Sequence, residues 1–281
     1  MERVLLEKTP PIARVIFNRP EVVNAADPPF LERLLAVIKD LSRDGKTRVV
    51  LVTGEGRGFC SGIDLKALAR DEIKLSWFRR WEEALRRLET LYDKAVVCGI
   101  HGACIGGGLQ FALACDMRVA AEDAIFSLTA VRHSIVPGLG VLRLPRAVGL
   151  TRGRLLSLMA TRIGAREAQA WGLVDRVVPR AELERALHEA AQAFVETAPT
   201  AFRETKKVLL RSFEPPFPRL LEVYLKGQRA CLLSADHHLA SDAYLAGKPP
   251  DFAAAKGRPA PSRVPASRCG GGRARAARSA G

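Results

Sequence analysis

The chain has 281 residues, 48% of them hydrophobic and 26% charged, which is the composition of a globular protein with a sizeable apolar core. Its 44 Lys and Arg outnumber its 30 Asp and Glu, giving a formal net charge of +14. No apolar run reaches the ~18–20 residues of a membrane-spanning helix, and the opening MERVLLEK is too short in apolar residues for a secretory signal. We therefore expect a cytoplasmic protein with no membrane span.

Half of the excess positive charge lies at the end of the chain. Residues 253–281 carry seven Lys and Arg and no acid, and are rich in Gly, Pro and Ala. This composition predicts a disordered basic tail. The tail either contacts phosphates without sequence specificity or is a solvated extension; we favour the second and expect no specific nucleic-acid partner. The remaining positive charge suits a polyanionic small molecule.

The six cysteines form no CxxC pair and have no histidine at a zinc-site spacing. Most of them stand in apolar strands or beside glycine, where a reduced cysteine behaves as a small hydrophobic residue. We expect neither a disulfide framework nor a metal site.

Strands and helices alternate through about residue 130. Short runs rich in β-branched residues predict strands, and apolar residues at a spacing of 3.6 predict helices. Strands are expected over residues 3–8, 12–20, 47–54, 94–102 and 117–123, and helices over residues 28–44, 65–91 and 106–116. This alternation is typical of an α/β fold.

The second half of the chain is mostly helical. Residues 145–179 predict a helix, a short turn and a second short helix, and the pattern after residue 181 is helical almost throughout. We expect an α/β core over residues 1–190, a helical region over residues 191–252 and the basic tail over residues 253–281.

Two glycine-containing turns occupy corresponding places, each after a buried strand and before a helix. They are GFCSGIDL at residues 58–65 and HGACIGGGLQ at residues 101–110. Glycine lets the backbone approach a ligand closely, and free N–H groups at the start of a helix favour negative charge. If the turns converge, they would place two backbone donors around one developing oxyanion. Alternatively, each turn is a packing or capping device, since neither matches GxGxxG or a P-loop.

The order of the motifs is more informative than any one of them. FNRPEVVNA, GFCSGIDLKAL, KAVVCGIHGACIGGGLQFALACDMRVA, VPGLGVLRLPRAVG and GAREAQAWGLVDRVV follow one another between about residues 3 and 252. Together they closely resemble the enoyl-CoA hydratase/isomerase (crotonase) family. The resemblance implies a spiral of ββα units with a helical C-terminal trimerisation region, and a homotrimer or dimer of trimers. It also implies an acyl- or enoyl-CoA thioester as ligand, with no cofactor besides the coenzyme A of the substrate.

The same resemblance suggests the residues of the binding site. It implies an oxyanion hole made by the backbone N–H groups of Ile63 and Gly107. It places a coenzyme A path along Ile63, Asp64, Leu65 and Lys66. Lys248, in AGKPPDF, would neighbour a coenzyme A phosphate or be an ordinary surface lysine. Asp116 matches a family position that we interpret as structural.

Both glutamates that the family's hydratases use for acid–base catalysis are missing. Their positions are Gln110 and Ala130, and an amide does not titrate. The aspartate of dienoyl-CoA isomerases and dehalogenases would stand at Gly138, so that acid is missing too. His133, close to Ala130, is the possible substitute base, since a neutral histidine can accept a proton near pH 7. Against this, its side chain could face solvent or another subunit.

Two classes of function remain open. The first is a hydratase-like lyase or isomerase that relies on enolate stabilisation, with Gln110 holding a water molecule. The second is a non-catalytic acyl-CoA-binding protein on the same scaffold.

Overall fold

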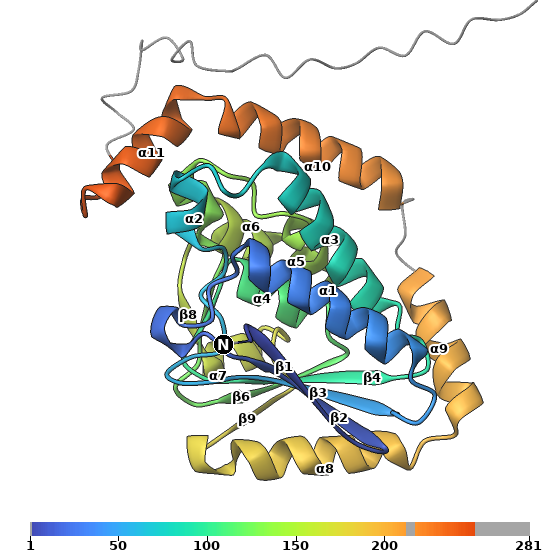
Figure 1. Cartoon of the computed structure of the whole chain (residues 1–281). Coiled ribbons are helices and arrows are strands. Elements are labelled where there is room, and N and C mark those ends of the chain that lie inside the picture. The colour runs from blue at the N-terminus through green and yellow to red at the C-terminus, as the bar shows by residue number, and fades with distance from the viewer. Residues whose placement is uncertain (1, 212–216, 251–281) are drawn as a thin grey trace, which may run out of the picture.

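A six-stranded sheet lies between two sets of helices in the computed structural model, which describes residues 2–211 and 217–250 (Figure 1). The predicted tail of residues 253–281 lies outside the described residues. The strands stand in the order β1, β2, β3, β4, β6, β9. Only β1 and β2 are antiparallel, and every other neighbouring pair is parallel. The strands are β1 (Val4–Thr9), β2 (Ile12–Phe17), β3 (Val49–Gly54), β4 (Ala95–Ile100), β6 (Met117–Ala121) and β9 (Arg176–Val178).

The central strands are apolar on both faces because each face carries its own core. Val50 and Val52 of β3 pack in the larger cluster, whereas Val49 and Leu51 pack in the smaller one. Alternate residues of a strand point to opposite faces, so the continuous apolar run is satisfied on both sides. The larger cluster lies under α1 (Pro28–Arg43), α3 (Leu75–Glu89) and α4 (Gly107–Leu113), and α8 (Leu183–Val195) covers the opposite face (Figure 1).

A second, three-stranded sheet contains β5 (Ala103–Ile105), β7 (Ile125–Ser127) and β8 (Ile163–Gly164). Two isolated bridges, between residues 26 and 63 and between residues 60 and 104, add to this layer. Several long strands are thus followed by a short extended segment and then by a helix. This is the ββα repeat expected of the fold, and the sequence patterns missed its second strands because they are only two or three residues long.

The single helix expected over residues 65–91 is wrong. The segment forms α2 (Leu65–Ala69) and α3, with a break between them. Asp71 in the break has a φ of 60°, a left-handed conformation that a helix interior does not contain. Periodicity missed the break because the buried Ile73 continues the apolar pattern across it. Residues 145–179 likewise hold more elements than expected, since α5 (Gly140–Val148), α6 (Leu150–Leu158) and α7 (Ala165–Ala170) are separate helices.

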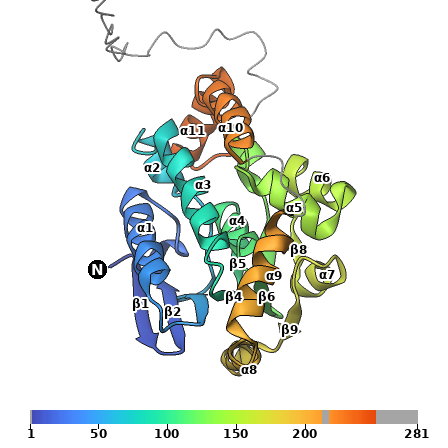
Figure 2. The ribbon, with the colours of Figure 1, turned by 90° about the vertical axis from the view of Figure 1, so that its right-hand side faces the viewer.

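The C-terminal helices wrap around the core instead of forming a separate bundle (Figures 1 and 2). They are α9 (Pro199–Arg211), α10 (Phe217–Leu232) and α11 (Ala235–Leu245). The helix α10 packs on α3, and α11 packs on α2. The boundary predicted at residue 190 falls inside α8. Three short 3-10 helices complete the fold: η1 (Pro20–Val22), η2 (Thr129–His133) and η3 (Arg180–Glu182).

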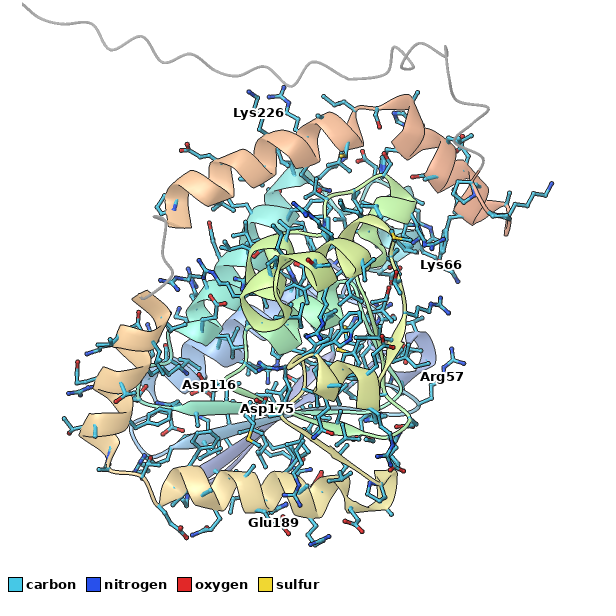
Figure 3. All side chains as sticks on the ribbon, turned by 180° about the vertical axis from the view of Figure 1, so that it is seen from behind. Arg57, Lys66, Asp116, Asp175, Glu189 and Lys226 are labelled. Carbon is cyan, nitrogen blue, oxygen red and sulfur yellow. The ribbon has the colours of Figure 1, made fainter. Side chains whose placement is uncertain are left out.

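A partly buried ion pair attaches α9 to the sheet. Asp116 lies between α4 and β6, near the start of β4 (Figure 3). Its Oδ2 accepts hydrogen bonds from the backbone of Val96 at 2.8 Å and from Lys206 of α9 at 2.6 Å. Burial outweighs these contacts and raises the Asp116 pKa. This position is therefore structural, as its motif predicts.

Candidate functional site

The two glycine turns meet beneath α3, as the sequence predicts for convergent turns. Backbone hydrogen bonds join them, from Cys60 to the carbonyl of Ala103 and from Ile105 to the carbonyl of Cys60, both at 2.9 Å. A Cβ atom on Gly62 would lie only 2.9 Å from the Gly107 nitrogen. Residues from separate segments of the sequence thus form one wall.

Glycine is required at the start of α4 for two reasons. Gly106 has φ 55° and ψ −115°, a backbone conformation that residues with a Cβ rarely adopt. A Cβ on Gly108 would collide with the carbonyl group of Cys60. The first turn of α4 can therefore press against the other loop only because these positions carry no side chain.

Two residues of this wall line one pocket and carry backbone donors that lack a protein acceptor in the described part of the chain. Ile63 and Gly107 both line it, and neither N–H group has an acceptor among the hydrogen bonds of residues 2–211 and 217–250. Backbone N–H groups away from bulk water are almost always paired. This pair can therefore donate hydrogen bonds to an oxygen that carries negative charge, as the N–H groups of an oxyanion hole do.

The opposite side of the pocket is apolar and aromatic. Phe78 and Trp81 of α3 face Ile135 and Val136, which follow η2. Trp81 stacks on Trp77 at a centroid distance of 5.3 Å, which fixes the indole rings in place. The cavity encloses about 50 Å³, room for a few water molecules or a short apolar group.

Among residues 2–211 and 217–250, no acid lines the pocket. Gln110 and Ala130 both line it, where the sequence predicts them to stand in place of two glutamates. His133 lines it as well, from the end of η2. Burial, aided by the positive charge of Arg132, lowers the pKa of His133 below its ordinary value, so its ring is neutral at pH 7 and can accept a proton. The structure thus brings Gln110, Ala130 and His133 together, and a catalytic role for His133 stays a prediction.

A carboxylate that the motifs did not indicate lies behind this pocket. Glu82 of α3 has no exposed surface. Its Oε1 accepts from the backbone of Leu139 at 2.8 Å, and its Oε2 pairs with Arg143 at 2.8 Å. Arg143 also binds Glu89 at 2.5 Å. Burial alone would lower the Arg143 pKa, but the two carboxylates outweigh it and raise that pKa.

A sequence signal for Glu82 exists. It stands four residues after Phe78 and beside Trp81, and therefore on the apolar face of an amphipathic helix. An acid on that face must be paired inside the protein, because an isolated buried charge is costly.

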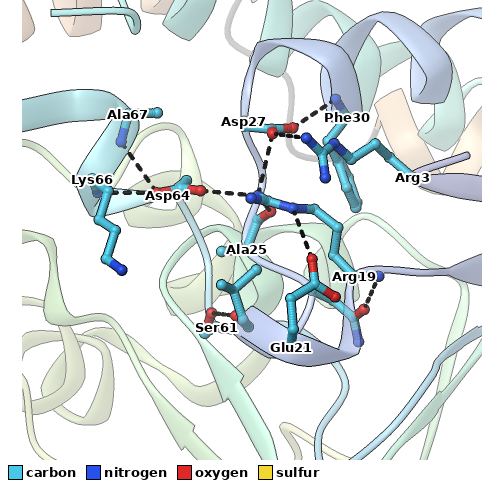
Figure 4. Close-up of polar contacts among 12 residues, drawn as sticks. Arg3, Arg19, Glu21, Ala25, Asp27, Phe30, Ser61, Asp64, Lys66 and Ala67 are labelled. Atoms are coloured by element: carbon cyan, nitrogen blue, oxygen red, sulfur yellow. Dashed lines mark hydrogen bonds and ion pairs between the residues drawn. The ribbon is translucent and has the colours of Figure 1, made fainter. Parts of the chain in front are cut away.

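Asp64 fixes the loop that carries Ile63 and does not line the pocket. Its Oδ1 caps α2 by accepting from the backbone of Lys66 and Ala67 at 3.0 and 3.1 Å. Its Oδ2 pairs with the buried Arg19 at 2.9 Å (Figure 4). Arg19 also donates to the carbonyl of Ala25 at 2.6 Å, so the ion pair joins this loop to the segment before α1.

The remaining predicted binding residues lie at the edge of the site. Leu65 lines the pocket. The side chain of Lys66 is exposed and extends from α2 (Figure 3). Lys248 is exposed after α11 and does not line the pocket. Contact of either lysine with coenzyme A stays a prediction.

The family sequence model described as Enoyl-CoA hydratase/isomerase matches residues 7–255. The chain belongs to this family. Its members act on CoA thioesters, as the name of the family and of its relatives states. The resemblance carried by the five motifs is therefore confirmed.

Relatives in the enoyl-CoA hydratase/isomerase family include both hydratases and isomerases. The chain is 34% identical to the peroxisomal Delta(3,5)-Delta(2,4)-dienoyl-CoA isomerase of Arabidopsis thaliana, with 86% of this chain and 92% of the relative covered. It is 31% identical to the Short-chain-enoyl-CoA hydratase of Clostridium acetobutylicum, with 87% and 95% covered. A crystal structure of an enoyl-CoA hydratase from Mycobacterium avium subsp. paratuberculosis K-10 matches with a TM-score of 0.80 at 27% identity, over 89% of this chain and 98% of that one. This match confirms the predicted fold class.

Two kinds of feature are absent from the part of the chain that the structure describes. Within residues 2–211 and 217–250, no helix is long and apolar enough to cross a bilayer. In the same ranges, no three His, Cys, Asp or Glu side chains are grouped so that they could hold a metal ion. That the protein needs no cofactor stays a prediction.

Proposed function

We propose that this protein binds an acyl- or enoyl-CoA thioester with the carbonyl oxygen between the N–H groups of Ile63 and Gly107, and that it catalyses a hydratase- or isomerase-type reaction. The observation that carries the proposal is the pair of backbone donors without acceptors on the wall of an apolar pocket. Such donors stabilise the enolate that forms when the α- or β-carbon reacts. Each contributes about 3–4 kcal/mol to the transition state.

For the addition of water, the side chains of the pocket supply the other steps. Gln110 holds the water molecule. The oxygen of this water attacks the β-carbon of the enoyl group, while neutral His133 takes a proton from the water. The electron pair of the bond between the α- and β-carbons forms a new double bond from the α-carbon to the carbonyl carbon. The carbonyl pair moves to the thioester oxygen, which gives the enolate. Collapse of the enolate re-forms the carbonyl group and returns the pair of the new double bond to the α-carbon, which takes a proton from the imidazolium. General acid–base catalysis of this kind contributes ~10²–10⁴-fold.

The test is to mix the purified protein with trans-2-enoyl-CoA thioesters of several chain lengths and follow the ultraviolet absorbance of the conjugated thioester. We expect the absorbance to fall well above the background rate, and both Gln110→Ala and His133→Asn to abolish the fall. Glu72→Gln, an exposed change after α2 at a residue that does not line the pocket, is the control. No loss at enzyme concentrations equal to the substrate would exclude hydration.

The second candidate is a non-catalytic acyl-CoA-binding protein. It is favoured by the pocket lining, in which neither Gln110 nor Ala130 can transfer a proton. Calorimetry distinguishes the two, because a binding protein would form a tight one-to-one complex with an enoyl-CoA that remains chemically unchanged. Deletion of residues 253–281 should leave either function intact, in line with the absence of a specific nucleic-acid partner.

A homotrimer or dimer of trimers is part of the proposal. The helix α6 and the residue after it carry several apolar side chains that are exposed in the single chain: Leu150, Leu155, Leu158 and Met159. Exposed apolar groups of this kind are typical of protein interfaces. Light scattering at micromolar concentration would give the mass of the assembly. A cytoplasmic location remains a prediction for localisation experiments.

A further inference from the structure

The amide of Gln110 has an oxygen without a partner. Gln110 is 5% exposed, and its Oε1 is buried with no hydrogen-bond donor among the described residues. The same small space is bounded by Glu82: a Cβ on Gly138 would lie within 3.0 Å of both Gln110 Oε1 and Glu82 Oε1. The amide oxygen of Gln110 and the carboxylate oxygen of Glu82, both hydrogen-bond acceptors, therefore border the same space. This space holds no donor for the amide oxygen. An unpaired buried acceptor is costly.

Exchanging the two ends of the amide removes this conflict. The oxygen and nitrogen of a glutamine amide have nearly the same shape, and their assignment follows from the hydrogen bonds around them. Glu82 is held by the Leu139 N–H and by Arg143, so it acts as an acceptor on this side. With Gln110 Nε2 toward Glu82, the amide donates to the carboxylate, and its oxygen turns to the pocket.

We propose that Glu82 is a positioning residue that holds the Gln110 amide in this orientation, so that the pocket offers a hydrogen-bond acceptor to the acyl group. The inference rests on the proposed binding of a CoA thioester. Gln110 stands one helical turn after Gly107 and therefore on the same face of α4. An acyl chain whose carbonyl oxygen binds at Gly107 places its β-carbon toward Gln110.

The group that this acceptor recognises is an O–H at the β-carbon. Its source is either the water that adds to an enoyl group or the hydroxyl of a 3-hydroxyacyl thioester. A ketone at the same carbon offers only lone pairs and would face the Gln110 oxygen unpaired. The site therefore favours a 3-hydroxyacyl over a 3-ketoacyl thioester.

The test compares the Kd values of 3-hydroxybutyryl-CoA and acetoacetyl-CoA by calorimetry. We expect the wild-type protein to bind the hydroxy compound more tightly, by about fivefold for one hydrogen bond. In Glu82→Gln, the cation of Arg143 attracts the oxygen of the new amide more strongly than the neutral Leu139 N–H does. The NH₂ group therefore takes the Oε1 position, faces Gln110 and turns that amide around. The preference should then fall to about one or reverse.

Glu89→Gln is the matched control. It also removes one carboxylate from Arg143, but Glu89 does not border the space at Gly138, so the preference should survive. A loss of stability does not change this ratio, because both ligands bind the same folded state and a smaller folded fraction raises both Kd values by the same factor. If Glu82→Gln does not fold, Gln110→Met tests the acceptor on which the inference depends. It should abolish the preference, and a preference that survives in Gln110→Met overturns the inference.

Each outcome supports or overturns the inference. Equal preferences in Glu82→Gln and Glu89→Gln, or a wild-type preference for the ketone, overturn it while leaving thioester binding intact. Failure of both thioesters to bind overturns the proposed function and the inference with it. If the wild-type protein prefers the hydroxy compound, a rise in conjugated-thioester absorbance from 3-hydroxybutyryl-CoA shows that the compound is dehydrated. The O–H bound by Gln110 is then that of the water that adds to the enoyl group. Binding without a rise assigns it to the ligand's own hydroxyl.

Discussion

Replacing Asp64 with alanine should destabilise the fold and weaken ligand binding together. The carboxylate has two separate tasks, since its Oδ1 caps α2 and its Oδ2 pairs with Arg19. Loss of the cap costs about 1 kcal/mol. The ion pair is more important, because the side chains of Arg19 and Asp64 are only 11% and 12% exposed.

Removing one partner of a buried pair costs about 3–5 kcal/mol. Here the cost should be lower, at about 2 kcal/mol, because the same Arg19 nitrogen keeps Asp27 at 3.4 Å and the carbonyl of Ala25 at 2.6 Å. Asp64→Ala should therefore lower the free energy of unfolding by about 3 kcal/mol, which is a fall in Tm of about 6–12 °C for a chain of this size. Asp64→Asn, which can keep the cap, should lose about 2 kcal/mol.

Urea unfolding followed by circular dichroism measures these differences, and calorimetry with butyryl-CoA gives the Kd. The Kd should rise in Asp64→Ala, because the residue next to Ile63 loses its anchor. Lys66→Ala, on the exposed side of the same turn, should change stability by less than about 0.5 kcal/mol. If Asp64→Ala is no less stable than Lys66→Ala, Arg19 does not depend on this pair and the reasoning is wrong.

Three further changes test other parts of the structure. Gly62→Ala should weaken thioester binding at least tenfold by calorimetry, because its Cβ would lie 2.9 Å from the Gly107 nitrogen at a φ of 99°; unchanged binding would contradict the site. Lys206→Met should lower the free energy of unfolding in urea by about 2 kcal/mol through loss of the partly buried pair with Asp116, whose side chain is 25% exposed, whereas Lys207→Met should change it little; equal effects would argue against the pair. The free energy of unfolding should also fall as pH drops from 7.5 to 5.5, by at most about 1.4 kcal/mol per pH unit for each histidine. Burial lowers the folded-state pKa values of His101, His133 and His237 below the unfolded value of 6.5, so the unfolded chain binds more protons in this pH range. A free energy of unfolding that does not change with pH would refute these shifts.

Local patterns were sufficient for much of the fold. The strands β1 to β4 and the helix α1 follow from alternation and from a spacing of 3.6, because each buries residues on a regular face. The break at Asp71 did not follow, since a positive φ in a polar residue leaves no mark on the apolar pattern. Likewise, the boundary expected at residue 190 divides α8, although this helix covers a face of the sheet as one element.

For the site, the sequence by itself determined the glycine turns and the absence of acids at positions 110, 130 and 138, because these depend only on residue type and spacing. Only the tertiary structure decided that Glu82 lies behind Gln110 and Gly138. Glu82, Gln110 and Gly138 are far apart along the chain, and their contact depends on how α3 packs over α4 and the loop before α5. A spacing pattern records neighbours on one element, whereas a buried carboxylate is stabilised by partners from several.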